Sequence, residues 1–144
     1  MKYDGRRSLA VPLGALMRDR GADVLAGAAY AVPVPLHRRR RRTRGFNQAA
    51  DLARQLQVPV LRALRRSKPT AAQASLPAAR RHQNVRDAFV ATRRARALRG
   101  AVVVLVDDVC TTGATLEACA RVLKEAGAAE VRAITAARVV GRPR

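Results

Sequence analysis

The chain has 144 residues, 49% of them hydrophobic, and a formal net charge of +19. This length suits one domain, residues 1–144, with a real core, and this apolar content excludes a chain that is disordered by composition. The sequence has only two cysteines, neither in a CxxC pair, and no apolar run long enough to cross a membrane, so we expect no zinc ribbon, no disulfide framework, no membrane insertion and a cytoplasmic location.

The first half of the chain predicts helices and strands in alternation. Apolar residues at helical spacing indicate a helix over residues 8–25, within an N-terminal helical segment (1–28), although Pro12 and Gly14 would disturb its interior. Residues 30–35 are a short strand candidate, and their prolines suggest a sheet edge or a strand end. The next expected elements are a helix over residues 46–56 and a possible strand over residues 58–64.

The second half contains a long segment without apolar periodicity and then the strongest elements of the chain. Residues 67–83 predict a long flexible loop; such loops are usually functional, often as a lid, and a disordered polar loop is the alternative. After it we expect a short strand (85–90), a basic connector (92–100), a buried strand (101–106), a helix reaching Ala126 and a closing strand (131–140). This alternation favours an α/β fold with a mainly parallel central sheet flanked by helices.

Residues 103–115, which read VVLVDDVCTTGAT, are the most informative stretch. The apolar run at 101–106 is rich in β-branched residues, as in a strand that is covered on both faces. Asp107 and Asp108 follow it, at the place where open α/β sheets bind ligands, beyond the carboxyl ends of strands. In a continuing strand these two side chains would face opposite ways, so both can serve one ligand only if the chain already turns here.

The loop after the two acids has the chemistry of a phosphate site. Thr111, Thr112 and Thr115 supply hydroxyls, and Gly113 permits a conformation or a close approach that a Cβ atom would hinder. A helix pattern begins at Thr115 and has a plausible stop at Gly127. The loop therefore lies at a helix N-terminus, where free N–H groups favour a phosphate. An ordinary strand–turn–helix, with the acids as helix caps, is the alternative.

The positive charge is concentrated upstream of this motif. Residues 1–100 contain 23 Lys and Arg against 5 acids, whereas residues 101–144 contain 6 against 5. Much of the excess lies in a loop that contains His37, Arg38, Arg39, Arg40, Arg41, Arg42 and Arg44. Guanidinium groups bind phosphate oxygens in bidentate fashion, so one or two of these arginines could hold a pyrophosphate, while most would form a solvated basic surface.

The stretch 103–115 resembles, position for position, the phosphoribosyl-pyrophosphate motif of type I phosphoribosyltransferases: four apolar residues, two acids, an apolar residue, one further residue, Thr-Thr-Gly and a final Thr. The resemblance implies the fold of that family, with a long flexible loop, and a site for a phosphorylated ribose. Asp107 and Asp108 would contact the ribose hydroxyls, directly or through Mg²⁺. The residues implied to cradle the 5′-phosphate are Thr111, Thr112, Gly113, Ala114 and Thr115.

Two further motifs narrow the resemblance. Residues 32–48 read VPVPLHRRRRRTRGFNQ, and the following segment carries Gln73, Leu76, Arg80, Asn84, Ala88 and Phe89 in that order. Together these motifs resemble the ComF family of phosphoribosyltransferase-like proteins, which is associated with competence, the uptake of external DNA. Many members carry an N-terminal cysteine-rich zinc-binding segment that this sequence lacks, and Arg38 and Arg41 stand where members often have proline and an apolar residue.

As an enzyme of this kind, the chain would catalyse attack on ribose C1 of phosphoribosyl pyrophosphate with loss of pyrophosphate, to an acceptor that the sequence does not identify. Asp107 and Asp108 are the catalytic candidates, and because adjacent carboxylates repel, one should have a raised pKa without ligand. Mg²⁺ would arrive with the substrate's pyrophosphate, and we expect no metal site of the protein's own. The pyrophosphate would be held by His37, Arg38, Arg39, Arg80 and Arg81.

Two other functions stay open on the sequence alone. The chain could be a non-catalytic protein that binds single-stranded DNA or serves a competence helicase as an adaptor, with Arg40, Arg41, Arg42 and Arg44 as nucleic-acid contacts. The aromatic content, two Tyr, two Phe and no Trp, argues against recognition by base stacking. The chain could also be an interaction scaffold with a vestigial site. The oligomeric state is not predicted.

Overall fold

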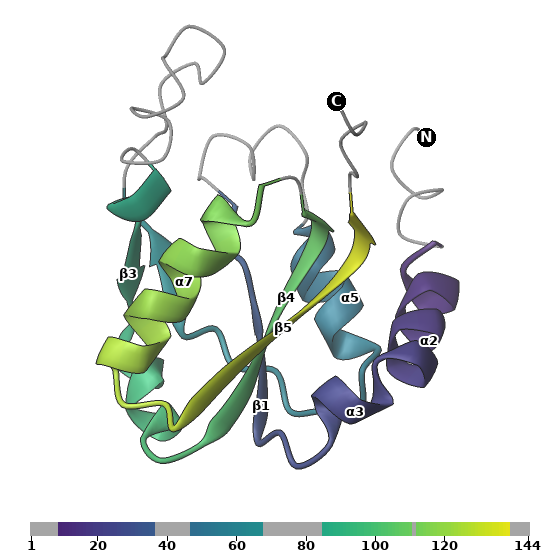
Figure 1. The fold of residues 1–144 in the computed structure, drawn as a ribbon, viewed down its shortest axis with the longest axis horizontal. Coiled ribbons are helices and arrows are strands. Elements are labelled where there is room, and N and C mark those ends of the chain that lie inside the picture. Colours follow the sequence, from purple (N-terminus) through teal and green to yellow (C-terminus); the bar gives the residue numbers. More distant parts are fainter. Residues whose placement is uncertain (1–8, 37–46, 68–84, 111, 139–144) are drawn as a thin grey trace, which may run out of the picture.

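The computed structural model describes residues 9–36, 47–67, 85–110 and 112–138. The centre of the molecule is a parallel sheet of β1 (Tyr30–Pro33), β4 (Val102–Cys110) and β5 (Glu130–Arg138), in the order β1-β4-β5. The central strand, β4, pairs with both of its neighbours in parallel (Figure 1). The predicted α/β architecture with a parallel central sheet is therefore confirmed.

Helices cover both faces of this sheet (Figure 1). On one face, α2 (Ala10–Arg20) and α5 (Gln48–Arg54) pack against the strands, and α3 (Ala22–Leu25) follows α2 near β5. On the other face, α7 (Ala114–Glu125) lies beside an antiparallel pair, β2 (Leu64–Arg66) and β3 (Phe89–Ala91). A 3₁₀ helix, η2 (Arg93–Leu98), connects β3 to β4.

Alternation along β4 divides the core in two. The fully buried side chains of Val103 and Leu105 belong to the cluster on the α7 face, whereas Val106 belongs to the cluster on the α2–α5 face. Because β4 is covered on both faces, its sequence is an unbroken apolar run up to the two acids.

The helix predicted over residues 8–25 is present as α2 and α3, with a break at Gly21. Pro12 does not disturb α2 because it is the third helical residue, where the N–H has no acceptor within the helix. Gly14 is buried against α5, and a Cβ atom there would lie 2.2 Å from the Cβ atom of Gln55. The glycine that weakens the sequence pattern therefore permits the close packing of the two helices.

The strand predicted over residues 58–64 is placed wrongly. Before Leu64, where β2 begins, only Val60 pairs within this range, through an isolated parallel bridge to Ala31. The strand at 30–35 is confirmed as β1, which lies at an edge of the three-stranded sheet and ends at Pro33. Its position agrees with the rule that proline is confined to edges and ends of strands.

The strand predicted over residues 85–90 is also displaced, because the chain turns first and β3 begins at Phe89. β2 and β3 have three residues each and pair with one another across a long sequence separation, which a local apolar pattern does not encode. The basic connector at 92–100 contains η2. Most of the predicted loop at 67–83 lies outside the described residues.

The ends of α7 follow the prediction. Gly113 precedes the helix with a left-handed φ of +83°, and Gly127 follows it with a φ of +109°. The N–H of Gly127 donates to the carbonyl of Lys124 (3.0 Å), and the N–H of Ala128 donates to the carbonyl of Leu123 (3.1 Å). This is the Schellman pattern, in which a glycine ends a helix and satisfies its last carbonyls.

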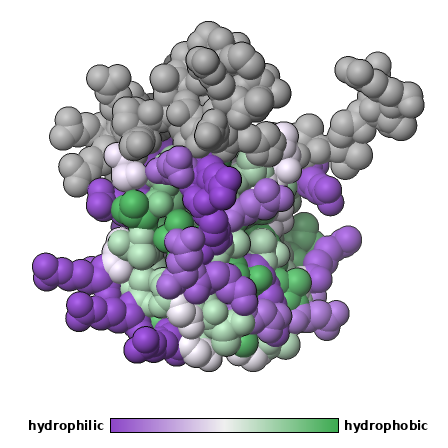
Figure 2. All heavy atoms as spheres, turned by 60° about the vertical axis from the view of Figure 1, so that its left-hand side comes forward, coloured by the Kyte–Doolittle hydropathy of each residue, from purple (hydrophilic) through white to green (hydrophobic). Residues whose placement is uncertain are grey.

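From the side of β3 and α7, the described surface is a mixture of polar side chains and apolar areas (Figure 2). No helix in the described part of the chain is both long and apolar enough to span a membrane.

Candidate functional site

Asp107 and Asp108 lie within β4, not at a turn. Asp107 pairs with Thr135, and the ladder with β5 continues through Cys110. The strand runs past the two acids because β5 offers a pairing partner as far as Arg138, and this tertiary pairing overrides the poor β-propensity of aspartate. Both side chains could contact one ligand directly only if the chain turned at this point. The chain does not turn here, so they do not share a ligand directly.

Because the strand continues, the two side chains open to different spaces. Asp107 shares its face with Leu105 and borders a small pocket of about 30 Å³ at the start of α7. Asp108 borders a mostly apolar groove of about 300 Å³ between α2, α5 and β5. Of the two acids, only Asp107 lines the pocket beside the predicted phosphate loop.

The turn between β4 and α7 forms the other side of that pocket. Gly113, Ala114 and Thr115 line it together with Asp107. No atom lies within 4 Å of the position that a Cβ atom on Gly113 would take, so the requirement for glycine here is conformational. The Thr112 hydroxyl accepts a hydrogen bond from the N–H of Ala114 (3.3 Å). Because that N–H is already paired, an anion beside Asp107 would use the N–H groups that follow Ala114 in the first turn of the 12-residue helix.

The surroundings of Asp107 raise the pKa of its carboxyl group to about 7. Burial is the largest cause, and a side-chain hydrogen bond with Asp108 and the negative charge of Asp108 add to it. The N–H of Asp108, which donates to the Asp107 carboxylate (2.9 Å), and the guanidinium of Arg66 act in the opposite direction. One of the two adjacent acids, Asp107, thus has the raised pKa that the sequence predicts, but burial contributes more to it than the expected repulsion between the carboxylates.

Of the two cysteines, Cys119 does not resemble a catalytic nucleophile. Burial raises the pKa of the Cys119 thiol to about 12, and the negative charge of Asp107 adds to this effect. A thiol with a raised pKa is a weak nucleophile, so Cys119 acts as a packing residue of α7. Cys110 is half-buried at the end of β4, where it borders the small pocket.

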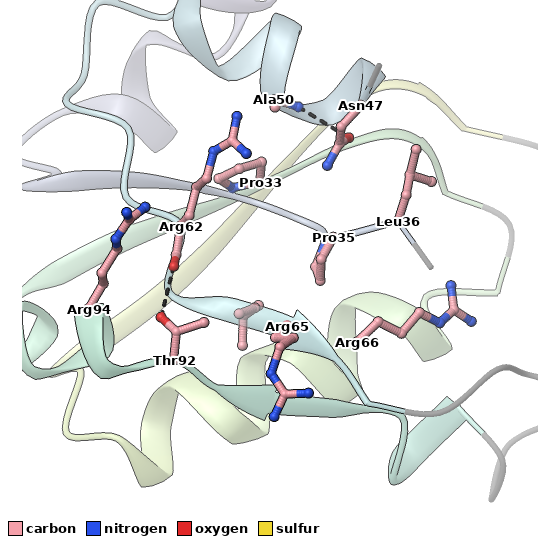
Figure 3. Close-up of a pocket in the computed structure, with 11 residues that line it drawn as sticks. Pro33, Pro35, Leu36, Asn47, Ala50, Arg62, Arg65, Arg66, Thr92 and Arg94 are labelled. Atoms are coloured by element: carbon pink, nitrogen blue, oxygen red, sulfur yellow. Dashed lines mark hydrogen bonds between the residues drawn. The ribbon is translucent and has the colours of Figure 1, made fainter. Parts of the chain in front are cut away.

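A second cleft, of about 260 Å³, lies beside the carboxyl end of β1 and is lined by Arg62, Arg65, Arg66 and Arg94 (Figure 3). The guanidinium carbon of Arg66 lies 5.3 Å from the centre of the Phe89 ring, a cation–π contact. Sequence reasoning missed this cleft. The available signal was the density of arginine around β2 and η2, but only the fold brings these two distant segments to one cleft.

The other predicted site residues lie outside the described residues, and their roles stay predictions. They are Thr111, His37, Arg38, Arg39, Arg40, Arg41, Arg42, Arg44, Arg80 and Arg81. In the described ranges, no group of three or more His, Cys, Asp or Glu side chains is placed to hold a metal ion.

The family model described as phosphoribosyl transferase domain matches residues 42–143. The chain belongs to this family. The matched region contains β4, α7 and the turn between them, so the candidate site lies inside the part of the chain that defines the membership.

Relatives of this phosphoribosyltransferase-family chain are named for competence and DNA utilization. It is 38% identical over 106 residues to Competence protein F of Haemophilus influenzae, covering 70% of this chain and 46% of that protein. It is 39% identical over 106 residues to DNA utilization protein YhgH of Escherichia coli K12 (70% and 45%), and 34% identical over 105 residues to Competence protein ComFC of Bacillus subtilis (72% and 42%). The resemblance to the ComF family is confirmed, and the chain spans less than half the length of these relatives.

Solved structures confirm the type I phosphoribosyltransferase fold. An allosteric regulatory enzyme of purine biosynthesis superposes with a TM-score of 0.59 and 23% identity, covering 94% of this chain and 27% of that one. A hypoxanthine phosphoribosyltransferase from Staphylococcus aureus superposes with a TM-score of 0.51 and 10% identity, covering 98% and 77%. At these identities the likeness is one of fold alone.

Proposed function

We propose that the chain binds phosphoribosyl pyrophosphate at the junction of β4 and α7. The observation that carries this proposal is that the carboxyl of Asp107 and the turn at 113–115 line one small pocket. At about 30 Å³ the pocket is too small for the whole ligand, but it suits one phosphate group held by the first N–H groups of α7. A ribose attached to that phosphate would lie near Asp107, which can accept hydrogen bonds from its hydroxyls.

The donor set near the turn fits the Mg²⁺ that phosphoribosyl pyrophosphate carries, because carboxylate oxygens are the ligands that Mg²⁺ prefers. Asp107 would hold the ion on the α7 face, whereas Asp108 opens to the groove on the other face and would not contact it. The bound ion would neutralise charge on the pyrophosphate. Asp107, once ionised, would orient the ribose and stabilise the positive charge that develops on it.

We extend the proposal to phosphoribosyl transfer, in which an acceptor attacks ribose C1 and pyrophosphate leaves. The names of the relatives support a place for this activity in competence or DNA use, and we propose that it occurs in the cytoplasm. His37, Arg38, Arg39, Arg80 and Arg81 remain the proposed pyrophosphate contacts, and the chemical class of the acceptor is open.

A calorimetric titration tests the proposed donor site. Phosphoribosyl pyrophosphate is added to the protein with Mg²⁺ and with EDTA, and ribose 5-phosphate and pyrophosphate are added in separate runs. We expect saturable binding that requires Mg²⁺, with ribose 5-phosphate as a weaker competitor. Absence of binding at millimolar donor would exclude the proposed function.

A second candidate is a non-catalytic nucleic-acid-binding or helicase-adaptor role, which the exposed arginines near η2 favour. Arg93, Arg94 and Arg96 are exposed, and none forms an ion pair with an acid of the described residues. Binding to single-stranded DNA through its backbone would weaken with salt, with a logarithmic slope of about −0.7 per phosphate contacted. An affinity that does not change between 50 and 300 mM salt would reject this candidate.

A further inference from the structure

The arginine-lined cleft beside β1 is separate from the pocket at Asp107. It lies between the end of β1, the segment before β2 and the start of η2, with Arg62 and Arg94 toward one end and Arg66 toward the other (Figure 3). None of the described turn residues 112–115 lines it. A ligand in this cleft would therefore bind at a different site from a phosphate at the N-terminus of α7.

The cleft concentrates positive charge, and no acid is among the described residues that line it. Ion pairs among the described residues join Asp51, Asp87 and Glu130 to arginines elsewhere in the fold. Arg62, Arg65 and Arg94 take part in none of these pairs. Cations gathered around one cleft repel each other, and a bound anion would remove this repulsion.

The backbone that carries Arg62 and Arg94 is held in place before any ligand binds. The Thr92 hydroxyl donates to the carbonyl of Arg62 (2.8 Å), and the N–H of Thr92 donates to the carbonyl of Ala63 (2.9 Å). These two hydrogen bonds join the segment before β2 to the start of η2. Two guanidinium-bearing segments that are fixed relative to each other lose less conformational entropy when an anion bridges them.

The remaining lining is apolar and compact, which limits the size and kind of ligand. Pro33, Pro35, Leu36 and Leu64 contribute to the walls of the cleft, whose volume is about 260 Å³. Small-molecule sites typically combine such apolar walls with a few polar groups, in cavities of roughly this size or larger. No aromatic side chain is among the described residues that line the cleft, so these residues offer no platform for stacking a strand of bases.

We propose that this cleft binds a small phosphorylated molecule other than the phosphoribosyl donor. Its phosphate would lie between Arg62 and Arg94, where two guanidinium groups can each donate two hydrogen bonds to phosphate oxygens. Its compact apolar part would lie against Pro33, Pro35 and Leu64. The proposal stands independently of the proposed function, because it uses none of the residues assigned to the donor.

Phenyl phosphate and inorganic phosphate are suitable probes, because they share the phosphate and only the first has a compact apolar part. We expect saturable binding of phenyl phosphate in calorimetry, at least fivefold tighter than that of inorganic phosphate. The double variant Arg62→Gln with Arg94→Gln should weaken it at least tenfold. Arg93→Gln with Arg96→Gln removes the same charge from residues that do not line the cleft, and should change the affinity less than twofold.

Three results would overturn the proposal. Equal losses in the two double variants would mean that phosphate responds only to net charge. A loss of phenyl phosphate binding in Gly113→Ala as large as that in the cleft variant would place the probe at the donor site. Tighter binding of an oligothymidylate than of phenyl phosphate, lost in the cleft variant, would make a nucleic-acid backbone the ligand. Thermal melting without ligand should confirm that all variants are folded, as expected for exposed arginines.

Discussion

On one face of the parallel sheet, α7 and the β2–β3 pair surround Asp107, and on the other face α2 and α5 surround Asp108. The α7 face brings a half-buried carboxyl together with a left-handed glycine turn and Arg66. The α2–α5 face brings a carboxyl against apolar side chains, including Leu9 and Leu13. Two neighbouring aspartates thus have different surroundings, because an extended strand directs consecutive side chains to opposite faces.

The two faces of the sheet therefore differ in role: one carries the groups suited to binding a ligand, and the other depends on helix packing. The α7 face has the groups that can bind a phosphate and a ribose, whereas the α2–α5 face depends on close helix contact at Gly14. Leu9, Leu13 and Leu16 remain exposed at and along α2, so that side of the molecule has apolar surface. Changes on the α7 face should alter donor binding, and changes on the α2–α5 face should alter stability alone.

The largest expected effect is on the pH dependence of stability, and it belongs to Asp107. Its pKa is about 7 in the folded protein against an ordinary value of 3.8, so the folded state binds more protons between these values and the free energy of unfolding falls as pH rises from about 4 to about 7. The fall due to Asp107 is on the order of 4 kcal/mol, at about 1.4 kcal/mol per pKa unit. Urea unfolding at pH 4, 6 and 8 measures it.

The matched variants for this measurement are Asp107→Asn and Asp108→Asn. The first should remove most of the decline. The second should only reduce it, because burial, the main cause of the raised pKa, persists when Asp108 is neutral. The same decline in Asp107→Asn as in the unchanged protein would refute the assignment of the raised pKa.

Gly14→Ala tests the α2–α5 face. The added Cβ atom would lie 2.2 Å from the Cβ atom of Gln55, so α2 and α5 must separate. Overpacking of this kind lowers the free energy of unfolding by about 1–3 kcal/mol. The higher helix propensity of alanine offsets at most about 1 kcal/mol of this loss. Donor affinity in calorimetry should stay within twofold. A variant that is more stable, or one that loses donor binding, would break the separation between the two faces.

Gly113→Ala tests the turn on the α7 face. A left-handed conformation costs a residue with a Cβ atom about 1–2 kcal/mol, so the free energy of unfolding should fall by that amount. The affinity for ribose 5-phosphate should fall at least fivefold, because the turn aims the first N–H groups of α7. Gly127→Ala, with a φ of +109° at the opposite end of the same helix, is the control. It should lose stability without losing affinity, and equal affinity losses would argue against a phosphate site at the turn.

The parts of the fold that the sequence predicts well are those with strong local signals. Three features can be predicted because each depends on neighbours in sequence. They are the apolar run of β4, the periodicity of α7 and the glycines at both ends of α7. The short strands β2 and β3 are misplaced because three residues carry little pattern and their pairing is long-range.

In the candidate site, too, local sequence predicts some features, and others depend on long-range structure. The turn at 113–115 and the acids of β4 are predictable from one contiguous motif. The separation of Asp107 from Asp108 is not, because it depends on how far β5 extends the ladder. The cleft is not predictable either, because Arg62 and Arg94 come to one cleft through the long-range pairing of β2 with β3 and the hydrogen bonds of Thr92.

The most direct test of the difference between the two faces is a calorimetric titration of Mg²⁺–phosphoribosyl pyrophosphate into the unchanged protein, Asp107→Asn and Asp108→Asn. We expect the affinity to fall at least tenfold in Asp107→Asn and no more than about threefold in Asp108→Asn. In the unchanged protein, binding should tighten as pH rises through about 7, where Asp107 loses its proton. Equal losses in the two variants, or a larger loss in Asp108→Asn, would contradict the assignment of donor binding to the α7 face.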